Sequence, residues 1–162
     1  MSDFSIERAT EDILGGVAEL EKLCFSFPWS KKALELLCAD KNVAFVAKDV
    51  NSGKVVAYGG MLSVVDEGQI TNVSTHPDFR RRGLGLKIVS ALIDYARNNG
   101  LVSISLEVRQ SNFAAIELSQ FVNSTIYFKK NKRKYLQALA FDSGAIYIIC
   151  IEILVTLWYN LH

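Results

Sequence analysis

The stretch FRRRGLGLKIVSALIDYA, residues 79–96, constrains the fold of this 162-residue chain more than any other segment. It joins a strand-like segment to an apolar helical pattern through three arginines, Gly83 and Gly85. Glycines let a backbone approach an anion closely, and the first turn of a helix offers unpaired N–H groups and a positive dipole end. The segment therefore indicates a phosphate-binding turn. An exposed basic turn without a ligand is the alternative that these residues leave open.

Two well-known phosphate motifs and several protein classes do not fit the chain. No Gly-Lys-Ser/Thr or GxGxxG follows the strand, so neither a Walker loop nor a dinucleotide fingerprint is present. With 18 basic and 17 acidic residues, the net charge of +1 gives no general case for nucleic-acid or membrane binding. The three cysteines form no CxxC and there are only two histidines, so we expect no metal site and a reducing, cytoplasmic location.

Residue periodicity predicts strands interrupted by single helices. Thr10 and Ser30 are expected to cap the first two helices. The expected helices are 8–25, 31–40, 83–100 and 111–121, and the expected strands are 43–49, 54–65, 67–77 and 101–108. The first two strands are read as a hairpin with the three-residue connection 51–53. This order favours an α/β (α+β) domain, with a mixed sheet and helices on both faces.

The apolar run 145–159 is the ambiguous part of the tail. A membrane-spanning helix needs about 20 apolar residues, and this run is shorter and contains Glu152. Its isoleucine, valine and aromatic content favours one or two strands. We therefore expect no membrane anchor, and a single domain over residues 1–162.

Three motifs together resemble one known family. Arg80-x-x-Gly83-x-Gly85 after the strand is similar to motif A of the GNAT superfamily of N-acetyltransferases. The segments CFSFPWSKKAL and LEVRQSN are similar to the ribosomal-protein-alanine N-acetyltransferase (RimI) type within that superfamily. The resemblance covers most of residues 1–118 and implies a GNAT fold with a mixed, mostly antiparallel sheet. It implies transfer of an acetyl group from acetyl-CoA, used as a cosubstrate, with no metal.

The resemblance implies a cofactor site built mainly from backbone groups. The pantetheine arm would pair with one strand like an added strand, and the pyrophosphate would lie on the glycine loop. Asn112 would also contact the cofactor, although a plain helix cap is its alternative role. The residues implied in cofactor binding are Val73, Ser74, Thr75, Arg80, Arg81, Arg82, Gly83, Leu84, Gly85, Leu86 and Asn112.

The resemblance also implies catalytic roles. Glu107 would act as general base on the incoming amine, with a structural pair to Arg109 as its alternative. Ser119 stands where the family has a general-acid tyrosine, so Tyr127 or Tyr135 is a candidate substitute for that acid. A base at neutral pH suits an α-amine, with a pKa near ~7.7–8.0, better than a lysine near ~10.4.

The acceptor is the least constrained part of the prediction. Phe27, Pro28 and Trp29 would belong to the loop that receives a peptide, with a core tryptophan in a helix-breaking loop as the alternative. The expected substrate is the N-terminal α-amine of a protein such as a ribosomal protein, and a monomer or weak dimer is expected. Residues 119–162 depart from the family pattern, which leaves open a small-amine acetyltransferase or a binding-only acetyl-CoA protein. The basic run KKNKRK is read as a solvated hairpin, without direct nucleic-acid binding.

Overall fold

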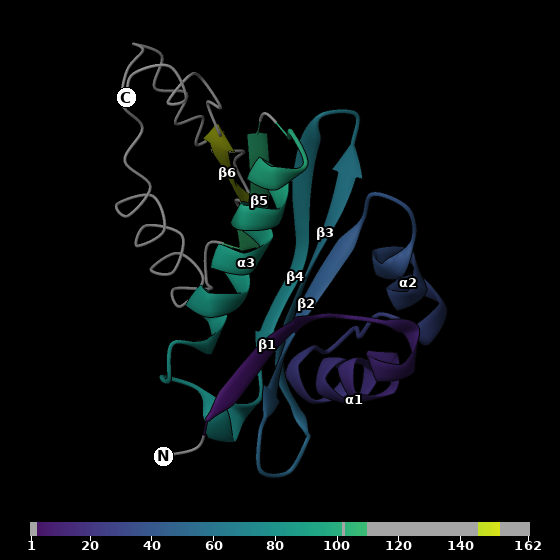
Figure 1. Cartoon of the computed structure of the whole chain (residues 1–162), viewed down its shortest axis with the longest axis vertical. Coiled ribbons are helices and arrows are strands. Elements are labelled where there is room, and N and C mark those ends of the chain that lie inside the picture. Colours follow the sequence, from purple (N-terminus) through teal and green to yellow (C-terminus); the bar gives the residue numbers. More distant parts are fainter. Residues whose placement is uncertain (1–2, 102, 110–145, 153–162) are drawn as a thin grey trace.

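A single six-stranded sheet forms the centre of the protein (Figure 1). The computed structural model describes residues 3–101, 103–109 and 146–152. Within these ranges each strand lies beside its neighbour in sequence, and only β4 and β5 run parallel. The predicted mixed, mostly antiparallel sheet is therefore confirmed. The strands are β1 (Phe4–Arg8), β2 (Val43–Asp49), β3 (Val55–Val64), β4 (Glu67–Thr75), β5 (Ser103–Arg109) and β6 (Ile146–Glu152).

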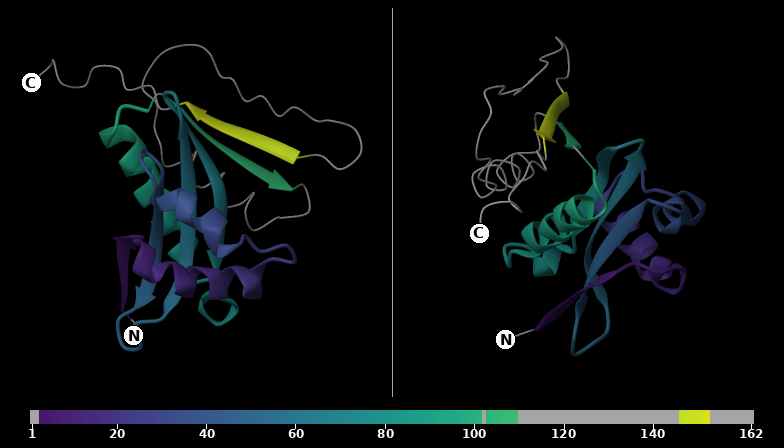
Figure 2. Two further views of the ribbon diagram at one scale, coloured as in Figure 1. Left: turned by 90° about the vertical axis from the view of Figure 1, so that its right-hand side faces the viewer. Right: turned by 45° about the horizontal axis from the view of Figure 1, so that its top comes forward.

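Helices cover both faces of the sheet, as the sequence predicts (Figure 2). The helix α3 (Leu84–Asn98) packs on one face, and α1 (Leu14–Cys24) and α2 (Lys31–Glu35) pack on the other. Alternation along β3 places Ala57 in the core beneath α3 and Tyr58 in the core beneath α1 and α2. Gly59 lets α3 approach, because a Cβ there would lie 2.5 Å from Ile88 Cγ2.

The helix α3 forms where the pattern predicts it. Its buried residues recur at helical spacing and face the sheet: Leu84, Ile88, Val89, Leu92, Ile93 and Ala96. The helix begins after Gly83, and Gly100 follows its end with a φ of +73°. A left-handed residue after the last turn is the usual way to end a helix, and glycine adopts it without a Cβ penalty. The expected glycine at each end is thus confirmed.

The N-terminal segment differs from its prediction. Residues 4–8 form β1, which pairs antiparallel with β2, so the expected helix 8–25 is wrong at its start. A 3-10 turn, η1 (Glu11–Ile13), precedes α1. The Thr10 side chain does not cap it, because its hydroxyl donates to Asp12 Oδ1 at 2.5 Å. This hydrogen bond holds the pKa of Asp12 below its usual value.

The other boundaries change little. Ser30 caps α2 as predicted, accepting from the Ala33 amide at 3.2 Å, and the expected helix 31–40 continues as the 3-10 turn η2 (Leu36–Cys38). The β2–β3 hairpin is confirmed, but residues 50–54 connect it. The strand β6 lies inside the apolar run 145–159, and no helix of the described residues is long and apolar enough to cross a membrane.

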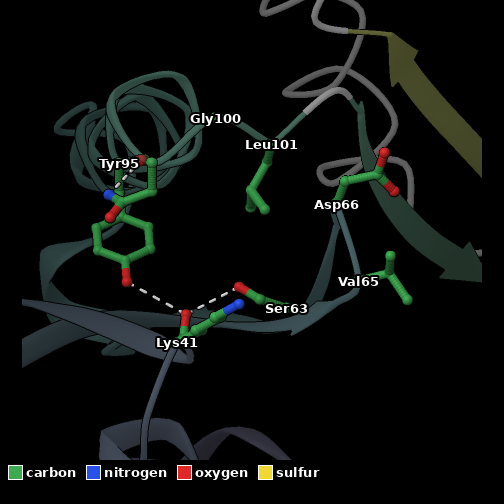
Figure 3. A pocket seen from close by; sticks show the side chains of 8 residues that line it. Lys41, Ser63, Val65, Asp66, Tyr95, Gly100 and Leu101 are labelled. Atoms are coloured by element: carbon green, nitrogen blue, oxygen red, sulfur yellow. Dashed lines mark hydrogen bonds between the residues drawn. The ribbon is translucent and has the colours of Figure 1, made fainter.

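The tip of the β3–β4 hairpin is strained. Its turn consists of Val65 and Asp66, and Val65 has a φ of +59°, which a β-branched side chain rarely adopts. The turn borders a pocket of about 170 Å³ between the hairpin and the end of α3, where Tyr95 and Ser63 both donate to the Lys41 carbonyl (Figure 3).

We expect Val65→Gly to stabilise the protein. The left-handed conformation destabilises the fold by about 1–3 kcal/mol when a residue such as valine adopts it. Replacing valine with glycine removes this strain, but it destabilises the fold by about 0.5–1 kcal/mol because glycine loses more backbone entropy on folding. Val65 is 87% exposed, so its side chain adds little packing. Urea unfolding should show a gain of about 1 kcal/mol. The matched control is Val64→Gly, also exposed but inside β3, which should destabilise; a loss in both variants contradicts the strain.

Candidate active site

The strands β4 and β5 separate halfway along β4 (Figure 2). Their parallel pairing ends at Ile70 and Leu106, although β4 continues to Thr75. Thr71 is the extra residue of a bulge in β4, opposite Gly60 of β3. A bulge bends its strand and interrupts the ladder, which explains why β4 leaves β5 here. Past Ile70 and Leu106 the described edges of β4 and β5 are therefore not paired with each other, and we call the region between these two edges the opening.

The edge of β4 that faces this opening carries backbone groups that β3 does not use. The His76 amide donates to the Val56 carbonyl at 2.8 Å, which marks a hydrogen-bonded pair of the β3–β4 ladder. Such pairs alternate in an antiparallel ladder. Ser74 therefore directs its N–H and C=O toward β3, whereas Val73 and Thr75 direct theirs toward the opening. This arrangement suits an extended ligand that adds itself as a strand.

The glycine loop leads from β4 into α3. It begins with the 3-10 turn η3 (Pro77–Phe79) and contains two residues in left-handed conformations, Arg81 with a φ of +63° and Gly83 with a φ of +75°. The first N–H groups of α3 have no partner within the helix and point into the loop. A Cβ at Gly83 would meet nothing within 4 Å, so space is open beside its backbone. Left-handed loop residues followed by a helix start are an arrangement suited to binding an anion.

The three arginines of the loop differ in their contacts. Arg80 Nε donates to the Thr75 carbonyl at 3.2 Å, and Arg82 donates to the Asp78 carbonyl at 3.2 Å and lies over the Phe79 ring. These two side chains hold the loop against β4 and η3. The Arg81 side chain is exposed.

Leu84 and Leu86, in the first turn of α3, differ in burial. Leu84 is buried in the core beneath α3, so only its backbone is available to a ligand at the loop. Leu86 is only partly buried against the same core. The predicted contacts through backbone N–H groups are compatible with both positions.

The loop between α1 and α2 lies on the face of the sheet opposite to α3. Phe27 is 88% exposed and Pro28 is exposed, whereas Trp29 packs against the core beneath α1 and α2. The partly buried Trp29 side chain packs as the alternative role requires, and its contact with an acceptor stays a prediction. Phe27 and Pro28 remain candidates for contact with an acceptor.

A buried carboxylate ties this loop to the sheet. Glu21 of α1 is fully buried, and its Oε2 accepts the Trp29 amide at 2.7 Å. Its Oε1 accepts from the Tyr58 hydroxyl and, at 3.0 Å, from Asn72 Nδ2. Burial, and then the hydrogen bond to Glu21, raise the pKa of Tyr58, which keeps this hydroxyl protonated as a donor. A buried carboxylate requires such a set of donors.

This network was not predicted from the sequence. Its one signal was an acidic residue within the apolar stripe of α1, beside Leu14, Val17 and Leu20. A charged residue in an apolar stripe is either exposed at the edge of the stripe or buried in the core and paired with hydrogen-bond donors. Only the positions of Tyr58 and Asn72 on other elements decide between the two.

The predicted catalytic residues fall at the edge of the described chain. Glu107 belongs to β5, and its backbone follows Leu106, the last residue paired with β4. Its backbone is thus at the start of the opening. Asn112, Ser119, Tyr127 and Tyr135 lie outside the described residues. Within the described ranges, no group of three or more histidine, cysteine, aspartate or glutamate side chains could hold a metal ion.

Comparison with known proteins places the chain in a family. The Acetyltransferase (GNAT) family pattern matches residues 14–121, which include both strands of the opening, the glycine loop and α3. The chain belongs to the GNAT family. Its membership makes it an N-acetyltransferase with acetyl-CoA as cosubstrate. The matched segment ends near Leu118, where the resemblance found in the sequence also ends.

Individual GNAT relatives agree with this placement. The chain is 35% identical over 120 residues to the ribosomal protein bS18-alanine N-acetyltransferase of Salmonella typhimurium, covering 73% of this chain and 77% of the relative. The crystal structure of the ribosomal-protein-S18-alanine N-acetyltransferase from Escherichia coli superimposes with a TM-score of 0.75 and 27% identity, over 99% of both chains. A GNAT family N-acetyltransferase (YhbS) from Escherichia coli in complex with CoA shares the fold, with a TM-score of 0.60 and 15% identity over 71% of this chain and 68% of that one.

Proposed function

We propose that this GNAT chain acetylates the N-terminal α-amine of a protein, with a ribosomal protein of the bS18 type as its substrate. The observation that carries the proposal is the 35% identity to the bS18-alanine N-acetyltransferase of Salmonella typhimurium over 73% of this chain. The exposed loop of Phe27 and Pro28 on the α1 face supports it, because a peptide end needs an open surface beside the opening.

The split sheet suits a direct transfer with both substrates bound. The edge of Val73 and Thr75 would hold the pantetheine arm, and the loop at Gly83 would hold the pyrophosphate through N–H groups. The thioester would then lie between β4 and β5, near Glu107. In the transfer a C–N bond forms between the acetyl carbon and the amine, and the C–S bond breaks. Glu107 takes one proton from the ammonium group before the attack, and the second proton passes from the nitrogen to the departing thiolate as the amide forms.

The pKa of the acceptor favours an α-amine over a lysine. At neutral pH an α-amine with a pKa near ~7.7–8.0 is deprotonated a few hundred times more often than a lysine side chain near ~10.4. A single carboxylate base is therefore enough for the α-amine. The same base would leave most lysine side chains charged and unreactive.

The proposal is tested by mass spectrometry of peptides incubated with the protein and acetyl-CoA. A peptide that carries the N-terminal sequence of bS18, including a lysine further along, should gain one acetyl group on its α-amine. The matched control is the same peptide with a blocked α-amine, which should stay unmodified. Acetylation of small amines without any peptide product would contradict the protein substrate. Calorimetric binding of acetyl-CoA without thiol release on any amine would contradict turnover itself.

A further inference from the structure

Asn72 of β4 lies near the point where β4 and β5 separate. It follows the bulge at Thr71, two residues past the last pair between β4 and β5. Its side chain lies on the α1 face of the sheet, because its Nδ2 donates to Glu21 at 3.0 Å. Asn72 thus borders both the opening and the face that carries the exposed loop of Phe27 and Pro28.

In the Asn72 carboxamide, Nδ2 has a hydrogen-bond partner and Oδ1 has none among the described residues. Glu21 accepts the Nδ2 hydrogen bond, and a carboxylate oxygen admits only a donor there. The orientation of the amide is therefore fixed, with Oδ1 on the side away from Glu21. Asn72 is 9% exposed, and its Oδ1 is buried without a hydrogen-bond partner among the described residues.

A second buried acceptor lies next to it. Ser74 shares the α1 face of β4 by strand alternation, and its Oγ is also buried and unpartnered in the described part of the chain. Buried polar atoms are nearly always hydrogen-bonded, so an exception requires an explanation such as a functional role or a bound water. Two such atoms beyond the bulge, on the side of the acceptor loop, indicate a place for a hydrogen-bond donor.

Glu21 connects this place to the acceptor loop. The same carboxylate that orients Asn72 accepts the Trp29 amide at 2.7 Å. A single side chain therefore sets both the position of the loop and the direction of Asn72 Oδ1. Tyr58, which donates to the same oxygen as Asn72, prevents Glu21 from turning.

We propose that Asn72 Oδ1 accepts a hydrogen bond from the acceptor amine, and that Glu21 is the positioning residue that directs Oδ1 toward it. The proposal rests on the proposed function in that the acceptor is an amine. A neutral primary amine carries two N–H groups and one lone pair. One N–H hydrogen leaves the nitrogen as the amide forms, and the other is free to donate to Asn72. That hydrogen bond fixes the direction of the lone pair that attacks the thioester.

Two variants test the proposal by replacing a hydrogen-bond acceptor of residue 21 with a donor. In Glu21→Gln, the amide oxygen still accepts from the Trp29 amide, because a backbone N–H can only donate. The amide nitrogen then faces Tyr58 and Asn72, and the Tyr58 hydroxyl turns to accept from it. Asn72 then turns its oxygen inward and presents Nδ2, a donor, to the amine. In the double variant Glu21→Gln with Asn72→Asp, residue 72 accepts from the glutamine and keeps an oxygen toward the amine. The single variant should lose activity, and the double variant should regain it.

The readouts are kcat and KM for the peptide, calorimetric Kd for acetyl-CoA, and the midpoint of thermal unfolding. We expect Asn72→Ala and Glu21→Gln to lower kcat/KM for the peptide about 10- to 100-fold, the effect of one hydrogen bond to a polar or charged group. The Kd for acetyl-CoA should change less than about 3-fold, within the usual context dependence of such measurements. The double variant should recover most of the loss.

The matched control is Asp49→Asn. Asp49 is also a buried residue with an unpartnered oxygen, but it lies at the end of β2, beside the edge strand β1. This variant should lose stability without losing kcat/KM. If Asn72→Ala behaves like Asp49→Asn, the buried atoms hold a structural water and the proposal is wrong.

Failure of the proposed function is distinguishable from failure of this proposal. If the wild-type chain acetylates only small amines, the peptide substrate is wrong, and the same variants are compared with that amine. If peptides are acetylated and Asn72→Ala leaves kcat/KM unchanged, only the role of Asn72 is wrong. A wild-type chain that acetylates no amine contradicts both.

Discussion

Turnover falls about 10²–10⁴-fold in Glu107→Gln, the range for removal of a positioned general base. The Kd for acetyl-CoA stays nearly unchanged, because no cofactor contact is assigned to Glu107. The physical reason is the acceptor, whose ammonium form must lose a proton before its nitrogen can attack. Steady-state rates with the α-amine peptide, measured beside calorimetric binding of acetyl-CoA, test both parts of this prediction.

The pH dependence of this defect identifies a base. An α-amine with a pKa near ~7.7–8.0 is mostly protonated at pH 7 and mostly deprotonated at pH 9. The difference between wild type and Glu107→Gln should therefore be largest at low pH and shrink as pH rises. The matched control is Glu67→Gln on the neighbouring strand, at the closed end of the β4–β5 pairing, which should retain wild-type turnover. Equal rates in Glu107→Gln and wild type at neutral pH would assign Glu107 a structural role only.

Gly83→Val weakens acetyl-CoA binding by about 100-fold. Hydrogen bonds to charged groups contribute about 1.5–3 kcal/mol each, so losing one or two backbone contacts to the pyrophosphate accounts for this factor. The new side chain meets no protein atom within 4 Å at its Cβ, so it occupies the open space beside the loop rather than the core. Calorimetric titration with acetyl-CoA measures the change.

Strain must be separated from obstruction in that experiment. A valine at a φ of +75° costs about 1–3 kcal/mol by itself. Gly100→Val provides the control, because Gly100 follows the other end of α3 with a φ of +73° and also has no atom within 4 Å of its would-be Cβ. Both variants should lose similar stability in thermal unfolding, and only Gly83→Val should lose affinity. Unchanged affinity in Gly83→Val would falsify the pyrophosphate site.

Local signals in the sequence predicted much of this fold. Ser30 caps α2 because its oxygen meets an amide only three residues away, and the stripe of Leu84, Ile88 and Leu92 repeats within one helix. Both features depend on neighbours along the chain. The strands 43–49, 55–64 and 67–75 likewise carry apolar or β-branched residues between turn residues. The glycine loop was found for the same reason, since its glycine, arginines and helix start are consecutive.

One missed element, the strand β1, depends on a distant partner. Residues 4–8 alone give no strong pattern, and they form β1 because β2 offers an edge to pair with. The expected cap at Thr10 fails for a local reason instead, because the Thr10 hydroxyl donates its hydrogen bond to the Asp12 carboxylate two residues away.

The sequence by itself determined the family, the phosphate-binding loop and the order of most elements, because each is written in contiguous residues. The tertiary structure alone decided where the site opens. The bulge at Thr71 appears only when β3 and β4 are in register, and it bends β4 away from β5. The tertiary structure also decided the environment of Glu21, because its partners Tyr58 and Asn72 lie 37 and 51 residues away along the chain. Packing brings these groups together, and a buried carboxylate exists only where such donors converge.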